Sequence, residues 1–210
     1  PGDLDEDQVW FIVKRTINGS TTRYVEYMSG FDFGTSANDA FFVDSGLTYS
    51  GSAATSISGL GHLEGEKVVL LGDGSTHPDV TVASGAIALS RSVQKAHIGF
   101  NYISNLQTMR LDAGGTEGTS QGKTKRINNI TLRLYKSVGV KVGSSETELD
   151  LIPFRSSADD MGEALGMFTG DKEVEFRGGY DVDGFVFVRQ DQPLPLTVLA
   201  IFPRLQTFDQ

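Results

Sequence analysis

The amino-acid sequence predicts an all-β protein, built from short-strand β-sandwich or partly closed barrel modules with little helix. Glycine accounts for 25 of the 210 residues, well above its usual share of about 7%. These glycines separate short runs of β-branched and aromatic residues, which is the pattern of closely spaced strands and turns. Cysteine is absent, so the core must form without disulfides, and a chain of this length can bury enough surface to do so.

The first expected element is a β-hairpin near the start of the chain. Residues 9–13 and 23–28 read as its strands, and Asn18-Gly19 between them accepts the positive φ values that tight turns require. The stretch that follows is rich in Gly, Ser, Asn and Asp, a composition typical of a loop or linker. Residues 1–40 are therefore expected to form a hairpin and a linker.

The second expected module, residues 41–100, is a small β-meander or partly closed barrel. Its strands are predicted at residues 67–71, 80–82 and 86–89, with tight turns at residues 72–74 and 84–85. The Ser- and Gly-rich stretch at residues 45–59 is of low complexity.

The third expected module, residues 101–210, resembles a β-sandwich. Strict alternation over residues 130–135 predicts a strand that buries Ile130, Leu132 and Leu134. Thr131, Arg133 and Tyr135 should then face outward. Further strands are predicted at residues 174–176, 185–188 and 197–202. Only residues 159–168 have a loosely helical pattern, weakened by Gly162 and Gly166.

The charge balance disfavours some classes of partner. The formal net charge is −9 at pH 7, which repels nucleic acid and anionic membranes at long range. No apolar run approaches the roughly 20 residues that span a bilayer, so no membrane-spanning segment is expected. The acidic start is unlike a signal peptide and lacks an initiator Met, so we expect part of a longer protein.

Three motifs invite a ligand-binding interpretation, and each has a simpler one. Residues 118–124 contain Gly-Lys-Thr, but only three residues separate the two glycines where a phosphate-binding loop needs four, so a flexible loop is expected. Asp181-Val182-Asp183-Gly184 is similar to the opening of a calcium loop, yet no Glu follows at the far end, so a β-turn is expected. The three histidines lie 15 and 20 residues apart, without the short spacing of metal ligands: they are His62, His77 and His97.

No enzyme activity and no cofactor are predicted. Three acidic pairs could in principle supply the acid and base of a glycosidase: Glu64 and Glu66, Asp159 and Asp160, and Glu173 and Glu175. Such pairs arise by chance in an acidic chain, and the sequence favours none of them. A serine-hydrolase elbow and a cysteine nucleophile are both absent from the sequence.

The most informative feature is a basic block followed by an acidic segment. Six basic residues and no acidic one lie between positions 123 and 141: Lys123, Lys125, Arg126, Arg133, Lys136 and Lys141. Residues 144–191 hold twelve acidic and four basic residues. The two segments could pair within one chain or across a subunit interface, or the basic block could face a channel or form a solvated surface.

Motifs along nearly the whole chain resemble one family. They are DQVW (7–10), RYVE (23–26), FVDSGLTY (42–49), ISGL (57–60), HLEGE (62–66), GTSQGKTKR (118–126), RLYKS (133–137), FTGDK (168–172) and QPLPLTVLA (192–200). In this order they resemble the tail nozzle or stabilisation proteins of short-tailed bacteriophages and prophages. The resemblance implies a C-terminal part that follows a missing β-propeller-like region, to which the hairpin and linker of residues 1–40 could belong. It transfers no active-site residue.

The resemblance also implies a function. The chain is expected to be a structural part of the virion tail, made in the bacterial cytoplasm. Its implied partners are other copies in a ring, the portal, the adaptor and other tail proteins, with DNA passing transiently through the channel. The alternative is a host-surface adhesin that binds glycans through Tyr180, Asp181, Asp183 and Phe185. A cell-wall hydrolase, the third alternative, has no supporting motif.

Overall fold

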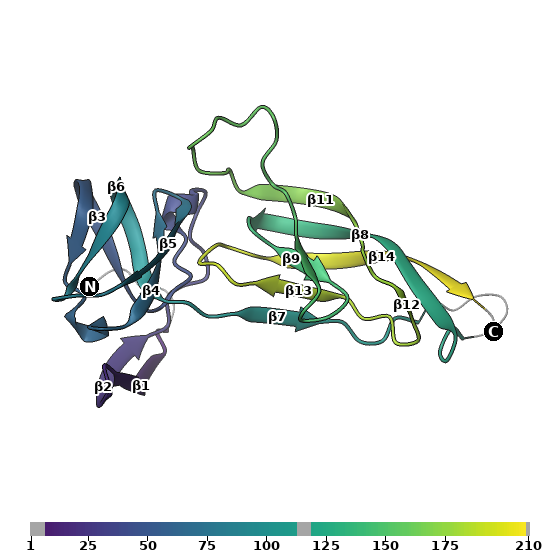
Figure 1. Cartoon of the computed structure of the whole chain (residues 1–210), viewed down its shortest axis with the longest axis horizontal. Coiled ribbons are helices and arrows are strands. Elements are labelled where there is room, and N and C mark those ends of the chain that lie inside the picture. Colours follow the sequence, from purple (N-terminus) through teal and green to yellow (C-terminus); the bar gives the residue numbers. More distant parts are fainter. Residues whose placement is uncertain (1–6, 113–118, 209–210) are drawn as a thin grey trace. The chain divides into compact units, whose positions relative to one another are not determined.

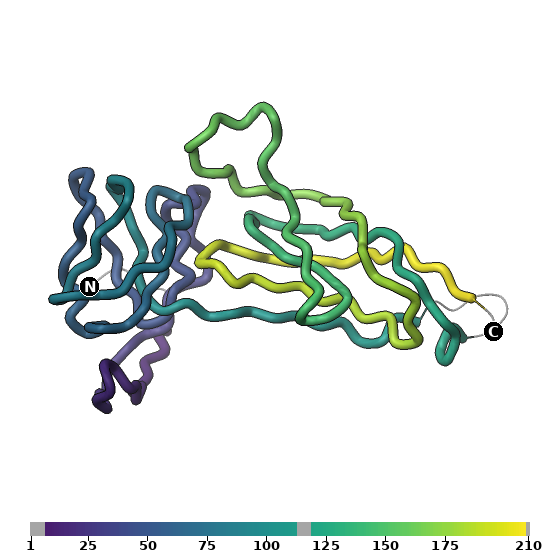
Figure 2. The backbone as a smooth tube through the Cα atoms, viewed as in Figure 1, coloured from purple at the N-terminus to yellow at the C-terminus, as the bar shows by residue number. Residues whose placement is uncertain are grey.

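The structure is a computed structural model that describes residues 7–112 and 119–208. Strands account for 56% of these residues and helix for 3%, so the all-β prediction is confirmed. The chain divides into two compact units, Pro1–Tyr102 and Ile103–Gln210. Figures 1 and 2 trace the chain through both units, which are described separately below.

Unit 1 contains a four-stranded antiparallel sheet with the strand order β3-β6-β4-β5. Its strands are β3 (Asp44–Ser58), β4 (Lys67–Gly72), β5 (Ser75–Thr81) and β6 (Ala86–Phe100). Two short 3-10 helices accompany them, η1 (Ala37–Asp39) and η2 (Gly61–Leu63). The predicted turns are confirmed, because Asp73-Gly74 and Ser84-Gly85 all have positive φ and connect the strands as expected.

Strand β3 differs most from the sequence-based expectation. Its residues belong to the low-complexity stretch, yet they form a 15-residue strand along β6, with several register shifts. Only Ile57 of β3 is buried, so this strand is held mainly by its hydrogen-bonded ladder. The apolar core lies on the other elements, where Leu63, Val68, Leu70 and Val93 are fully buried.

A two-stranded hairpin completes unit 1. Strands β1 (Trp10–Ile17) and β2 (Ser20–Tyr27) pair in antiparallel register around Asn18 and Gly19, whose φ values are 46° and 74°. The predicted hairpin and its turn are therefore confirmed. The turn end of the hairpin is anchored in unit 1: Ile17 is buried in the core, and the Tyr24 hydroxyl donates a hydrogen bond to the His62 carbonyl oxygen.

A half-buried ionic cluster also holds the hairpin to the sheet. The Arg15 guanidinium donates two hydrogen bonds to each of two carboxylates, Glu26 on β2 and Asp44 on β3, at 2.8–3.3 Å. Glu26 also accepts a 2.9 Å hydrogen bond from the Ser45 hydroxyl. The hydrogen bonds from Arg15 lower the pKa of Glu26, and the one from Ser45 acts in the same direction. Such bidentate, charge-assisted pairs fix geometry as well as adding energy.

Unit 1 should accordingly lose stability in acid through Glu26. Because the folded-state pKa of Glu26 is lowered, its contribution is fully present above the unfolded-state pKa, near 4.5, and is lost as pH falls through the folded value. Denaturant unfolding followed between pH 7 and pH 3 should show the gap between wild type and Glu26→Gln closing below about pH 4.5. Asp79→Asn is the matched control, since Asp79 belongs to the exposed pair with Lys67. A gap that stayed constant with pH would contradict this role for Glu26.

Unit 2 is built from two four-stranded antiparallel sheets. One has the order β10-β9-β13-β7, with β7 (Ser104–Gln107), β9 (Lys141–Gly143), β10 (Leu149–Leu151) and β13 (Phe187–Gln190). In the other, β8 (Thr124–Ser137) pairs with β11 (Phe168–Glu175), β12 (Tyr180–Asp181) and β14 (Val198–Phe208). Both sheets contribute to one core, which includes Leu132 of β8, Val142 of β9 and Val188 of β13. This arrangement agrees with a sandwich-like module.

The central strand β8 confirms the predicted alternation. Ile130, Leu132 and Leu134 are fully buried, whereas Arg133 and Tyr135 on the opposite face are exposed. The loosely helical pattern of residues 159–168, which Gly162 and Gly166 weaken, does not form a helix. Turns, bends and irregular chain occupy that segment up to Phe168, where β11 begins, and Gly162 has a φ of 92° that an α-helix does not permit.

Candidate functional site: the outer face of the β11-β8-β14 sheet

The outer face of the β8 sheet gathers charged and aromatic side chains from three strands. Register places Arg133 of β8 opposite Asp171 of β11 and Ala200 of β14, and places Thr131 opposite Glu173 and Phe202. Directly opposed residues in antiparallel strands share a face. Further exposed residues on β14 are Arg204 and Phe208.

Charges on this face pair within the chain. Arg133 donates from Nε to Asp171 Oδ1 at 2.7 Å and from a terminal nitrogen to Oδ2 at 2.8 Å. The same guanidinium lies over the Phe202 ring, 5.2 Å from its centroid. The hydrogen bonds between Arg133 and Asp171 raise the pKa of Arg133 and lower that of Asp171. The acidic partner of Arg133 is thus a residue of its own sheet.

Most other members of the basic block also have partners inside the chain. Lys141 forms an ion pair with Asp191. Their side chains are 31% and 24% exposed, so most of each is buried. Arg126 lies over the Tyr180 ring at 5.5 Å, and the Lys136 ammonium lies 5.2 Å from the Tyr135 ring. Lys123 is half-buried. The basic and acidic segments therefore meet within unit 2, which is the first of the alternatives left open by the sequence.

Lys125 does not belong to any exposed block. Its side chain points inward with Ile127, the residue is only 2% exposed, and its ammonium donates a 3.0 Å hydrogen bond to the Val182 carbonyl oxygen. The strand alternation explains this placement, because positions 125 and 127 of β8 share the core-facing side. The expectation of an accessible Lys125 is wrong.

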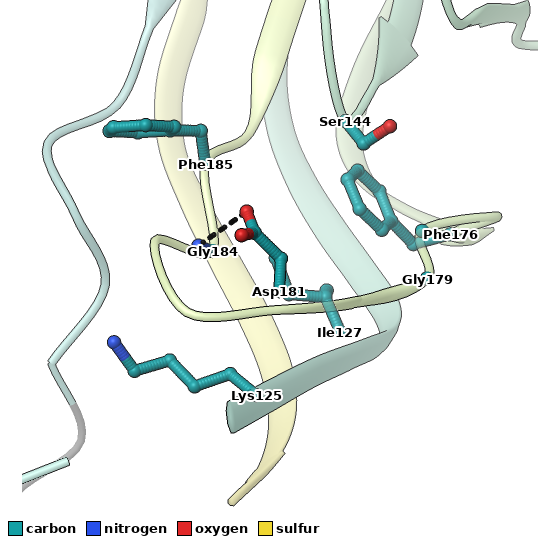
Figure 3. A pocket seen from close by; sticks show the side chains of 9 residues that line it. Lys125, Ile127, Ser144, Phe176, Gly179, Asp181, Gly184 and Phe185 are labelled. Atoms are coloured by element: carbon teal, nitrogen blue, oxygen red, sulfur yellow. Dashed lines mark hydrogen bonds between the residues drawn. The ribbon is translucent and has the colours of Figure 1, made fainter. Parts of the chain in front are cut away.

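The Asp181–Gly184 segment forms a tight turn that closes on its own side chain (Figure 3). Asp181 accepts hydrogen bonds from the backbone N–H groups of Asp183 at 3.2 Å and Gly184 at 3.1 Å. Burial alone would raise the pKa of Asp181, but these backbone donors and the nearby Lys125 lower it. Asp183 forms an ion pair with Arg110 at 2.9 Å. Both carboxylates are therefore committed to structural contacts.

A small hollow lies beside this turn. Its lining residues are Lys125, Ile127, Ser144, Phe176, Gly178, Gly179, Asp181, Gly184 and Phe185. Its volume of about 30 Å³ admits one or two waters. Ligand cavities are about 300–1,000 Å³, so the hollow cannot enclose a sugar ring.

The proposed adhesin residues separate into two groups. Tyr180 is 61% exposed and makes an edge contact with Phe208, with ring centroids 5.2 Å apart. Together with Arg126 they form an exposed aromatic cluster. Asp181, Asp183 and Phe185 instead belong to the turn and the hollow. The sequence did not indicate Phe208, which lies on β14. Arg126 belongs to the basic block, but its contact with Tyr180 depends on the pairing of β8 with β12.

The histidines have separate structural surroundings. His97 contacts the Thr48 hydroxyl at 2.8 Å and the Asn38 carbonyl oxygen at 2.9 Å, and burial lowers its pKa. His77 contacts Ser90, and His62 lies 3.0 Å from the Ser45 carbonyl oxygen. In the described part of the chain, no three His, Asp or Glu residues are grouped so that they could hold a metal ion.

Three of the acidic candidates serve as backbone acceptors, among them Asp159, which accepts a hydrogen bond from the Ser156 N–H group. Glu64 accepts hydrogen bonds from the N–H groups of Ser84 and Gly85, and Glu66 accepts one from Asn18. Gly118, the first residue of the apparent phosphate loop, lies outside the described residues. Farther along that loop, the Ser120 hydroxyl donates to Asp112 at 2.8 Å.

Comparison with known proteins leaves the residues themselves as the basis for a functional argument. None of the helices in the described residues has the length and apolar character needed to cross a membrane. No protein-family model matches the chain, and the search of curated proteins found no relative.

Proposed function

We propose that the chain is a structural component of a bacteriophage tail, of the nozzle type, which self-assembles and contacts other tail proteins around the DNA exit channel. The observation that carries this proposal is the ordered sequence resemblance, which runs through both units. FVDSGLTY and HLEGE lie in unit 1, and FTGDK and QPLPLTVLA lie in unit 2.

The resembling motifs contribute to the scaffold, which supports a structural role. Leu60 and Leu63, from ISGL and HLEGE, are buried in the core of unit 1, and Leu194 from QPLPLTVLA is buried in unit 2. Motif residues that are buried in the core maintain the fold, which is what a structural protein requires of them. We propose no catalytic role for the chain, because the Glu64 carboxylate accepts hydrogen bonds from the backbone of Ser84 and Gly85, and Asp171 is engaged with Arg133.

The charge distribution also suits a DNA conduit. Each phosphate neutralised by Lys or Arg adds salt-dependent affinity, so a conduit that releases DNA should offer few uncommitted cations. Arg133 and Lys141 are paired with carboxylates of the same chain, and the net charge is −9.

The proposal is tested by locating the chain in intact particles. Gold-labelled antibodies raised against it should mark the tail beneath the head vertex in electron micrographs of the phage or induced prophage that encodes it. Labelling elsewhere on the virion, or none on disrupted particles that retain their tails, would rule out the nozzle role. In the same system, Arg126→Glu with Arg133→Glu tests whether this face contributes to ring assembly, since both side chains reach the surface.

The second candidate function is a glycan-binding adhesin, favoured by the exposed Tyr180–Phe208 cluster. Sugars often bind proteins by stacking on exposed aromatic rings, and Arg126 beside Tyr180 could donate hydrogen bonds. A glycan array should then detect binding that is lost in Tyr180→Ala. Tyr135→Ala, at a 44% exposed tyrosine of the same sheet, is the matched control and should keep binding. An array without signal for the wild type removes this candidate.

A further inference from the structure

One face of the β1–β2 hairpin carries an ordered ladder of exposed side chains. The register pairs Trp10 with Tyr27, Ile12 with Val25, Lys14 with Arg23, and Thr16 with Thr21. Since opposed residues of antiparallel strands share a face, these four rungs lie side by side. We call this surface the ladder face.

The apolar part of the ladder face is strongly exposed. Trp10, Ile12, Val25 and Tyr27 are 58%, 78%, 69% and 57% exposed. The Trp10 and Tyr27 rings contact each other with centroids 5.3 Å apart. Figure 1 shows the hairpin projecting from the rest of unit 1. A hairpin of two strands is marginal in water on its own, and contiguous exposed apolar surface of this kind marks interaction sites.

The third rung adds a pair of opposed cations. Lys14 and Arg23 are exposed and directly opposed, and like charges in that position are destabilising. Within residues 7–112 and 119–208, neither forms an ion pair. The neighbouring Arg15 has the opposite orientation and is occupied by Glu26 and Asp44. A partner that offers acceptors or π faces to the third rung would remove this repulsion.

We infer that the ladder face is self-complementary and joins two copies of the chain through a two-fold axis at the Ile12–Val25 rung. The aromatic rung lies two residues to one side of this rung and the cationic rung two residues to the other, about 6.8 Å in each direction. Antiparallel stacking therefore sets the aromatic rung of each copy against the cationic rung of the other. Each contact occurs twice, as in any isologous interface.

The chemistry of each opposed rung favours this arrangement. Lys14 and Arg23 meet Trp10 and Tyr27 of the other copy, a cation–π geometry in which Trp is the best acceptor face. Ile12 and Val25 meet their own symmetry mates and exclude water.

The dimer should be weak. A standard specific interface buries about 800 Å² per partner, and a face of eight side chains on two strands is smaller than that. The contact is isologous, unlike the head-to-tail contact that closes a ring, so the inference does not rest on the proposed function.

Trp10 provides a direct probe, because it is the single tryptophan of the chain. Sedimentation of the 210-residue chain over a concentration series should show a reversible monomer–dimer equilibrium. Over the same range, Trp10 emission should shift to shorter wavelength and its quenching by acrylamide should decrease, since dimerisation covers the ring.

Two variants test the two kinds of rung. Ile12→Ser removes the apolar contact at the axis, and Lys14→Glu sets a carboxylate against the Trp10 face of the other copy. Each should weaken dimerisation about tenfold or more. Met161→Ser is the control, since Met161 is a 91% exposed apolar residue of unit 2, and it should leave the equilibrium unchanged. Far-UV circular dichroism and melting of each variant establish that it is folded.

Three results would overturn the inference. The first is a wild type that stays monomeric to millimolar concentration with Trp10 fully quenchable. The second is a dimer that both folded variants leave unchanged. The third is a monomer whose Trp10 emission shifts only on vesicles of anionic lipid, which would assign the ladder face to a membrane surface instead.

Discussion

Replacing Leu132 with alanine is expected to lower the free energy of unfolding of unit 2 by about 2–5 kcal/mol. Leu132 is fully buried at the middle of β8, the strand that pairs with β11, β12 and β14. The truncation removes apolar contacts and leaves a cavity that surrounding strands can close only in part. Chemical denaturation followed by far-UV circular dichroism measures the loss.

Leu199→Ala is the matched control for this variant. Leu199 lies on β14 of the same sheet but is 59% exposed, so its truncation should change stability by no more than about 0.5 kcal/mol. Equal losses in the two variants would mean that β8 does not have the buried central position described here.

Lys125→Glu is expected to destabilise unit 2 by about 3–5 kcal/mol. The substitution removes the hydrogen bond to the Val182 carbonyl oxygen and buries a carboxylate close to Asp181. The buried carboxylate would have no opposite charge beside it to offset the cost of its desolvation. Lys125→Met should cost less, because it keeps the apolar stem and introduces no charge.

Arg126→Glu is the control for this prediction, because it makes the same charge reversal at an exposed position. Arg126 is the next residue of the same strand, but it faces solvent and contacts the Tyr180 ring. Its reversal should cost only about 0.5–1 kcal/mol. Denaturant midpoints of the three variants give the comparison. If Lys125→Glu were as mild as Arg126→Glu, the inward orientation of Lys125 would be wrong.

Local chemistry was sufficient to predict several elements. The period-two pattern of residues 130–135 identified the buried face of β8, because a half-buried strand must alternate. Asn18-Gly19 identified the first hairpin, because few other dipeptides accept two successive positive φ values. Each signal depends only on near neighbours in the chain.

Other elements depend on distant partners and were missed. Strand β3 is rich in Ser, Gly and Ala and has little strand preference of its own, but β6 supplies a ladder for it. At residues 159–168 the two glycines outweigh the loose helical spacing, as the sequence indicated, and no helix forms. Lys125 was counted as surface because a lysine is rarely buried.

On the outer face of the β8 sheet, too, local features could be predicted from the sequence and long-range contacts could not. The sequence identified Arg133 as outward-facing, but its partners Asp171 and Phe202 lie far along the chain and meet it only through strand register. The ladder face is a different case. Alternation is the same whether an apolar face is covered or open, so only the exposed fractions distinguish the two.

The position of β8 has a consequence for how unit 2 reaches its folded state. β8 pairs with β14, about 65–85 residues later in the chain, and β7 pairs with β13 over a similar separation. Such non-local pairings make folding slow, since long loops must close before these particular contacts form. During synthesis, the edge of β8 that pairs with β14 therefore stays without a partner strand until β14 has left the ribosome. Unit 1 can form its sheet well before then, so the interval of greatest aggregation risk belongs to unit 2.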